Sequence, residues 1–231
     1  MSAALIQVHD LTRLDAKGTQ RILDRVNLSI REGDQIGLVG PTGSGKSSLL
    51  RAIAMLDHSD LGNIVFQGQS IRRDAVPAYR RRVIYLQQRP EFVAGSLLHN
   101  LELPFRLGVS ADHLDRAQVT QWLDRLSFSR GMLEQDVDSL SGGQRQVAAL
   151  VRAMTLSPQV LLLDEPTAEL DPPSTRRFER LVMEWQNERA GTSLSQRAFL
   201  WTSHNSDLIG RMATRVLTID KGSLQSEPSD V

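Results

Sequence analysis

Gly40-Pro41-Thr42-Gly43-Ser44-Gly45-Lys46-Ser47 is the stretch that decides the fold, because it meets every fixed position of the phosphate-binding loop G-x-x-x-x-G-K-[ST]. Residues 34–39 before it are typical of a short buried strand, and residues 46–54 after it are typical of a helix. Glycines permit the turn between them, and the free N–H groups at a helix start attract anions. The stretch predicts a P-loop that binds a nucleoside triphosphate; the alternative is a glycine-rich turn that binds nothing.

Three side chains at the end of the loop have expected roles. Lys46 supplies a positive charge for the β- and γ-phosphates, and the Ser47 hydroxyl is placed to ligate Mg²⁺. Ser48, the next residue of the helix, is counted with residues 40–47 as a nucleotide-binding position. The loop is therefore expected to hold a nucleotide together with Mg²⁺.

Length and composition limit the possible classes of protein. A chain of 231 residues is long enough for one large domain, or for a core with a subdomain. Lys and Arg number 27 and so do Asp and Glu, so no broad basic surface for nucleic acid is expected. The lack of cysteine excludes disulfides and thiol catalysis. Residues 1–10 carry no export signal, and no apolar run approaches the ~20 residues that cross a bilayer, so we expect a soluble, intracellular protein.

Hydrophobic periodicity divides the chain into strands and helices. A helical pattern covers about residues 90–157, where apolar positions such as Leu114, Ala117, Trp122 and Leu126 recur three or four apart. A long amphipathic helix is expected at about residues 174–188. Strands are predicted at residues 5–8, 26–30, 62–66, 83–86, 160–163, 199–203 and 216–219. The middle of the chain should thus form a helical lobe within an α/β protein.

Two adjacent carboxylates, Asp164 and Glu165, end the apolar strand at residues 160–163. Paired acids at a strand end often just meet solvent. In a chain with a P-loop they have a chemical use: the first can hold Mg²⁺ through water, and the second can orient or deprotonate the water that attacks the γ-phosphate.

A third motif, Leu140-Ser141-Gly142-Gly143-Gln144, opens another helix. Ser141 is a good N-cap, so this is a second helix start that can bind an anion, or else an ordinary capped helix. With this motif the sequence resembles the ATP-binding cassette family, whose Leu-Ser-Gly-Gly-Gln signature it matches in full. The resemblance covers essentially the whole chain, with the motifs in the family's order.

The resemblance implies an α/β fold: a P-loop NTPase (RecA-like) core with an N-terminal antiparallel β-subdomain and an inserted α-helical subdomain. Residues 1–231 would form a single ATPase domain. Residues 1–88 and 158–231 would be the catalytic core with the β-subdomain, and residues 89–157 the helical subdomain that carries the signature.

The resemblance also implies roles for individual residues toward ATP and Mg²⁺. Gln88, in Gln88-Arg89-Pro90, would contact Mg²⁺ or the attacking water, beside Asp164 on the metal and Glu165 as the catalytic carboxylate. His204 would be the switch histidine that contacts the γ-phosphate, and Asp171 would belong to the D-loop, residues 168–171. Ser141, Gly142, Gly143 and Gln144 would bind the ATP of another subunit.

Two departures from the family pattern stand out. Residues 1–65 contain no Phe, Tyr or Trp to stack on adenine, and Arg13 or Leu14 lies where that ring is usual. Base stacking should then be weak, or supplied by an Arg plane. Asn205 follows the histidine where Asp is commoner, a change not expected to abolish hydrolysis.

The function implied by the resemblance is that of an ATP-hydrolysing transporter subunit. It would form a homodimer around two ATPs and power a separate multi-span membrane permease, from the cytoplasmic face of the cell membrane. The permease would dock on residues 88–97, where Phe92 and Val93 offer apolar contacts unless they pack inside the lobe. The sequences around Tyr85 and Trp201 further resemble FetA-type cassettes of two-component iron-efflux systems.

Two other functions remain open from the sequence. A soluble cassette ATPase that acts on nucleic acid or ribosomes usually has two cassettes or a long coiled-coil insertion, and the zero net charge also disfavours a nucleic-acid partner. A small-molecule P-loop kinase is disfavoured by the complete signature. A neighbouring gene for a membrane protein would favour transport.

Overall fold

The computed structural model describes residues 4–107, 113–188 and 196–225. Its centre is a six-stranded sheet with the strand order β10-β9-β3-β8-β7-β6. The strands are β3 (Gln35–Val39), β6 (Val83–Leu86), β7 (Val160–Asp164), β8 (Ala198–Thr202), β9 (Arg215–Asp220) and β10 (Ser223–Leu224). All neighbours are parallel except β9 and β10. The carboxyl ends of β3, β6, β7 and β8 therefore meet at one edge, where ligands bind in open α/β sheets.

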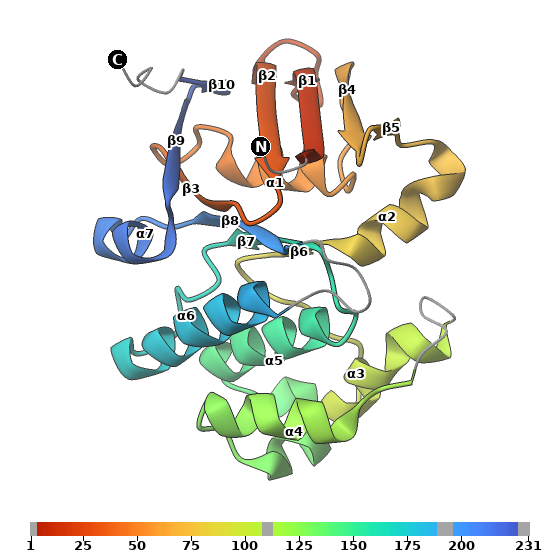
Figure 1. Ribbon diagram of the computed structural model, residues 1–231, viewed down its shortest axis with the longest axis vertical. Helices are drawn as coiled ribbons and strands as arrows, with labels where there is room; N and C mark the ends of the chain where they lie inside the picture. Colours follow the sequence, from red (N-terminus) through yellow and green to blue (C-terminus); the bar gives the residue numbers. More distant parts are fainter. Residues whose placement is uncertain (1–3, 108–112, 189–195, 226–231) are drawn as a thin grey trace.

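A second, antiparallel sheet flanks this core (Figure 1). It has the order β2-β1-β4-β5, with β1 (Ala4–Leu14), β2 (Arg21–Arg31), β4 (Leu61–Phe66) and β5 (Gln69–Ser70). The first two strands are much longer than the sequence pattern predicts, because polar residues interrupt the apolar alternation in their outer halves. Both main features of the predicted fold class, the P-loop core and the N-terminal antiparallel sheet, are confirmed.

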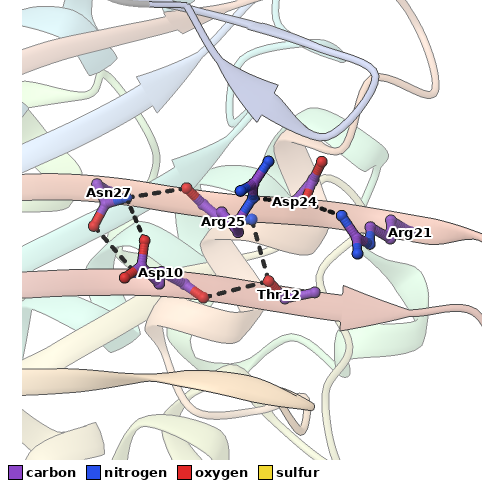
Figure 2. Close-up of polar contacts among 6 residues, drawn as sticks. All are labelled: Asp10, Thr12, Arg21, Asp24, Arg25 and Asn27. Atoms are coloured by element: carbon purple, nitrogen blue, oxygen red, sulfur yellow. Dashed lines mark hydrogen bonds and ion pairs between the residues drawn. The ribbon is translucent and has the colours of Figure 1, made fainter.

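Polar contacts between β1 and β2 accompany the apolar packing in those outer halves, and Figure 2 shows the polar contacts. Asp10 and Arg25 both have φ of 47°, and the β1–β2 register shifts between Val8 and Leu11. The Asn27 side chain accepts a bond from the Asp10 N–H at 3.0 Å and donates to the Asp10 carboxylate at 2.9 Å. Thr12 Oγ1 accepts from the Arg25 N–H at 3.2 Å. These side chains supply partners where the irregular ladder cannot, so the strands continue past the apolar segment.

Seven α-helices and three short 3₁₀ helices are assigned within the described residues. They are α1 (Lys46–Ile53), α2 (Val76–Arg82), α3 (Leu97–Arg106), α4 (Arg116–Arg125), α5 (Gly142–Met154), α6 (Pro172–Asn187), α7 (Ser206–Met212), η1 (Arg73–Ala75), η2 (Arg130–Glu134) and η3 (Val137–Ser139). Figure 1 shows α3 and α4 in a lobe on the far side of α5 from the core sheet. None of the helices in the described ranges is both long and apolar enough to span a bilayer.

The apolar face of α4 differs from the predicted one. Ala117 is exposed, and the buried positions are Val119, Trp122, Leu123 and Leu126. Alanine is small enough to be tolerated on either face of a helix. Counting Ala117 as a core position therefore predicted the wrong face as the buried one. The helix itself lies within the predicted helical region.

Two hydrophobic clusters lie on opposite faces of the core sheet. Leu161 and Leu163 of β7 enter the cluster that includes α5, α6 and the helical lobe. Val160 and Leu162 enter the cluster that includes α1 and the antiparallel sheet. The lobe thus shares its core with one face of the sheet, and its assignment to residues 89–157 as a separate subdomain stays a prediction.

Candidate functional site

The P-loop leaves the carboxyl end of β3 and enters α1, as the sequence predicts. A Cβ atom at Gly40, with φ of 154°, would lie 2.1 Å from the Ile219 carbonyl oxygen. Gly45, with φ of 108°, would place a Cβ 3.0 Å from the Ile22 carbonyl oxygen. Both positions therefore require glycine. At Gly43 a Cβ would meet no described atom within 4 Å, so the tip of the loop borders open space.

Polar side chains of the loop lie close to its backbone. The buried Lys46 ammonium donates to the carbonyl oxygens of Gly40 at 2.8 Å and Pro41 at 3.0 Å. The Ser44 hydroxyl is buried and has no hydrogen-bond partner among the described residues. Ser47 is exposed in the first turn of α1. Lys46 and Ser47 thus come together with the glycines, as predicted.

Asp164 ends β7 and is only 4% exposed. Its Oδ1 accepts a hydrogen bond from Thr202 Oγ1 at 2.9 Å, and its Oδ2 accepts one from the Tyr85 hydroxyl at 2.8 Å. Thr202 is the residue of β8 that pairs with Asp164 in the parallel ladder. Two neutral donors from the neighbouring strands therefore set the plane of this carboxylate.

Glu165 lies at the centre of the predicted catalytic group. Its Oε1 is 2.9 Å from His204 Nε2, and its Oε2 accepts from Gln88 Nε2 at 3.2 Å. Its backbone has φ of 47°, and its N–H donates to Thr202 at both the hydroxyl, 3.0 Å, and the carbonyl oxygen, 3.2 Å. The structure thus brings Glu165, His204 and Gln88 into one cluster. Backbone strain held by surrounding bonds is typical of functional positions.

The residues present fit a nucleotide with Mg²⁺. The open space at Gly43, the unpaired Ser44 hydroxyl and the Lys46 charge suit phosphate oxygens. The Ser47 hydroxyl and the Asp164 carboxylate are oxygen donors of the kind that Mg²⁺ prefers. ATP and Mg²⁺ can therefore be accommodated without a change of residue.

The signature residues form the first turn of α5. Ser141 Oγ accepts from the Gln144 N–H at 3.3 Å, and Gln144 Oε1 accepts from the Ser141 N–H at 2.8 Å, which together form a capping box. A Cβ at Gly143 would lie 3.0 Å from the Glu169 carbonyl oxygen, so the turn also packs against the D-loop of its own chain. The predicted N-cap at Ser141 is confirmed.

Gln146, two residues past the signature, joins two loops of the site. It is 2% exposed, its Nε2 donates to the Gln88 carbonyl oxygen at 3.4 Å, and its Oε1 accepts from the Glu169 N–H at 3.1 Å. The loop that contains Gln88 and the D-loop are thereby connected through α5.

Two other predicted or noted residues act as helix caps. Asp171 Oδ1 accepts from the Ser174 N–H at 2.7 Å, and this bond lowers the pKa of its carboxyl group. Asn205 caps α7 by accepting from the Leu208 N–H at 3.1 Å. A nucleotide-binding role for Asp171 stays a prediction; its local role is to start α6.

The Arg13 guanidinium, the candidate for stacking on a base, is engaged elsewhere. It lies 2.6 Å from Asp57, which also pairs with Arg51 at 2.7 Å. The bond from Arg51 holds the pKa of Asp57 below its usual value. The ion pair between Arg13 and Asp57 therefore links β1 to the segment that follows α1.

Sequence reasoning missed Tyr85, Thr202 and Gln146 as parts of the site. A single signal was available for Thr202, a polar residue at the end of the strand Ala-Phe-Leu-Trp-Thr. Tyr85 and Gln146 read as ordinary strand and helix positions, because only strand register and helix packing bring them to the acids and loops.

The expected docking residues Phe92 and Val93 behave differently from each other. Val93 is 53% exposed, as predicted. Phe92 is half-buried against the helical cluster, with the Arg152 guanidinium 4.4 Å from its ring centroid. Of the two alternatives left open by the sequence, packing inside the lobe therefore applies to Phe92, and a docking role for Val93 stays a prediction. A groove of about 280 Å³ lies beside them, lined by residues that include Leu56, Tyr85, Pro90, Pro104, Arg152 and Leu156.

Comparisons with known proteins show which proteins the chain resembles in sequence and in fold. Residues 23–168 match the family described as ABC transporter. The chain is 29% identical over 218 residues to the probable iron export ATP-binding protein FetA of Escherichia coli strain K12, which covers 94% of this chain and 92% of that protein. It is 35% identical over 221 residues to the lipoprotein-releasing system ATP-binding protein LolD of Maricaulis maris, with 92% of each chain covered. A solved dimeric ATP-binding cassette bound to ADP and Pi has the same fold, with a TM-score of 0.83 at 24% identity over 96% of this chain and 97% of that one.

Proposed function

The chain belongs to the ABC transporter family, and on that premise we propose that residues 40–48, Gln88, Asp164, Glu165 and His204 form its ATP-hydrolysing site. The observation that carries the proposal is the carboxylate of Glu165 held between His204 and Gln88, at the sheet edge where the P-loop begins. A carboxylate positioned at that edge could act as the general base for an attacking water.

The roles follow from the chemistry of each side chain. The loop N–H groups and Lys46 would hold the phosphates, while Ser47, Asp164 and Gln88 would hold Mg²⁺ directly or through water. Bound Mg²⁺ neutralises negative charge on the phosphate oxygens. Glu165 would accept a proton from the attacking water, and His204 would face the γ-phosphate and orient that carboxylate.

We further infer that two copies act together. The P-loop helix α1 and the signature helix α5 contribute to clusters on opposite faces of the core sheet. A single ATP is therefore not expected to contact the first turns of both α1 and α5 in the same chain. A second copy related by two-fold symmetry could bring its signature, Ser141 to Gln144, to this P-loop, and Asp171 lies in the D-loop that would face it.

A separate membrane permease is the proposed partner, and the groove beside Gln88 is the proposed dock. The groove adjoins the segment whose glutamine contacts Glu165, so a helix seated there could influence hydrolysis. Docking on a permease would keep the protein at the cytoplasmic face of the membrane.

Efflux of iron or another metal ion is the transport function we propose. Its support is the similarity to FetA over nearly the full length of both chains. LolD, at higher identity, is named for lipoprotein release, so the cargo would be set by the permease.

The proposal is tested by searching beside the gene for one that encodes a multi-span membrane protein, and by purifying the chain with that protein. The pair in liposomes should hydrolyse ATP faster when iron or another metal ion is present. Phosphate release from the purified chain is measured first, because no ATPase activity with Mg²⁺ would contradict the catalytic assignment itself. Activity that no metal ion stimulates would contradict only the cargo.

A further inference from the structure

Tyr85 is one of only two tyrosines in the chain, and its hydroxyl reaches the buried end of β7. It donates to Asp164 Oδ2 at 2.8 Å, while Thr202 donates to Oδ1 of the same carboxylate. Each oxygen of Asp164 thus has one fixed partner, and the carboxylate cannot rotate without breaking a bond.

The same tyrosine also borders the groove beside Gln88. Its side chain is half-buried, and it lines this groove together with Leu56, Pro90 and Pro104. The Tyr85 side chain therefore bonds to Asp164 through its hydroxyl and also forms part of the groove wall. Among the described residues, Tyr85 alone both lines this groove and donates a hydrogen bond to Asp164.

We propose that Tyr85 is a positioning residue that orients Asp164 toward Mg²⁺ and connects the groove to that carboxylate. The proposal rests on the proposed function, because it takes Asp164 as the metal-side acid. Residues that orient metal ligands commonly change metal affinity about 10- to 100-fold when they are replaced. A change of that size can be measured without turnover.

The first test compares Tyr85→Phe with Tyr79→Phe. Tyr79 is buried in α2 and donates its hydroxyl to the Ile53 carbonyl oxygen at 2.6 Å, so the control removes an equivalent oxygen away from the acids. Both variants are made in a Glu165→Gln background, and Mn²⁺ binding in the presence of ATP is followed by electron paramagnetic resonance. ATP binding in excess chelator serves as the metal-free reference.

Tyr85→Phe should bind Mn²⁺ about tenfold or more weakly, with metal-free ATP binding unchanged. Tyr79→Phe should keep the metal affinity of the background. Equal Mn²⁺ affinities in the two variants would overturn the inference while leaving the proposed function intact. A parent chain that binds no Mn²⁺ with ATP would instead contradict the proposed function.

The second test occupies the groove, and it uses the absence of cysteine from the chain. Leu56 lines the groove and is 45% exposed, so Leu56→Cys can carry a bulky maleimide label there. Val216, 47% exposed on β9, gives the control site Val216→Cys. Labelling at residue 56 should shift Mn²⁺ affinity when Tyr85 is present, and should have no effect in Tyr85→Phe. An equal shift in both backgrounds, or none in either, would overturn the connection.

Discussion

At the scale of single residues, Glu165 brings the most constraints together. Its backbone is in the left-handed region, its N–H is bonded twice to Thr202, and its two carboxylate oxygens meet His204 and Gln88. These bonds hold the side chain in place before any ligand arrives. Replacement by an isosteric side chain should therefore change chemistry more than position.

Glu165→Gln should lower ATP turnover about 10²- to 10⁴-fold, because the amide cannot accept the proton of the attacking water. ATP binding should be retained, since Lys46, Ser47 and Asp164 are unchanged. Phosphate release and equilibrium ATP binding are measured on the same preparation. Turnover at the wild-type rate would show that Glu165 is not the catalytic carboxylate.

The sequence predicts the P-loop and the titratable side chains of the candidate site, because motif spacing places them at strand ends. Asp164 is the last residue of β7, Glu165 follows it, and His204 lies two residues past β8; parallel strands bring those ends together. The partners Tyr85 and Thr202 were not predictable in the same way. Their roles depend on which strands are neighbours and on the register of the ladder, and neither is visible in a single strand.

At the scale of elements, α5 carries the signature and also connects the D-loop to the segment that contains Gln88. Its capped first turn packs on the D-loop, and Gln146 bonds both the D-loop and the Gln88 segment. Sequence periodicity predicts this helix and its N-cap well, because apolar spacing and capping are local properties. The extent of β1 and β2 was not predictable, since bonds between Asp10 and Asn27 and between Arg25 and Thr12 sustain it across the strands.

Gln146→Met should lower the turnover number about 2- to 30-fold while leaving ATP affinity unchanged, the range seen when residues between coupled sites are altered. Gln186→Met is the matched control. Gln186 is also a buried helical glutamine that donates to a backbone carbonyl, that of Gly33 at 2.9 Å, away from the nucleotide loops. Both variants are compared by steady-state kinetics and thermal unfolding. A similar loss of turnover in both variants would show that the Gln146 substitution acts by destabilising the fold and not through the two loops.

At the scale of the whole molecule, the sheet divides the protein so that α1 and α5, the helices that follow the P-loop and carry the signature, pack on different faces. The proposed dimer resolves this by pairing the signature of one copy with the P-loop of the other. The fold class follows from the motifs, whereas the shared core of lobe and sheet does not, because it depends on how α5 packs across β7 and β8.

Ser141→Arg should leave ATP binding by the single subunit nearly intact and abolish hydrolysis, because the bulky side chain would block the ATP of the partner copy. Ser129→Arg is the control, since Ser129 also caps a helix, η2, and is exposed in the same lobe. Binding is measured at concentrations where the protein is monomeric. Loss of binding by the Ser141→Arg monomer would contradict a site shared between copies.

Because the side chains of β7 alternate between the two faces of the core sheet, the sheet should separate the packing energies of the two hydrophobic clusters. Leu162 and Leu163 are covalent neighbours, yet their side chains enter separate clusters. Each change to Val should cost about 1 kcal/mol of unfolding free energy. In a double-mutant cycle by urea denaturation, the two costs should add to within ~0.5 kcal/mol. Leu163 and Trp201, register partners in one cluster, should instead be non-additive. Each face of the sheet could then be repacked without compensation on the other.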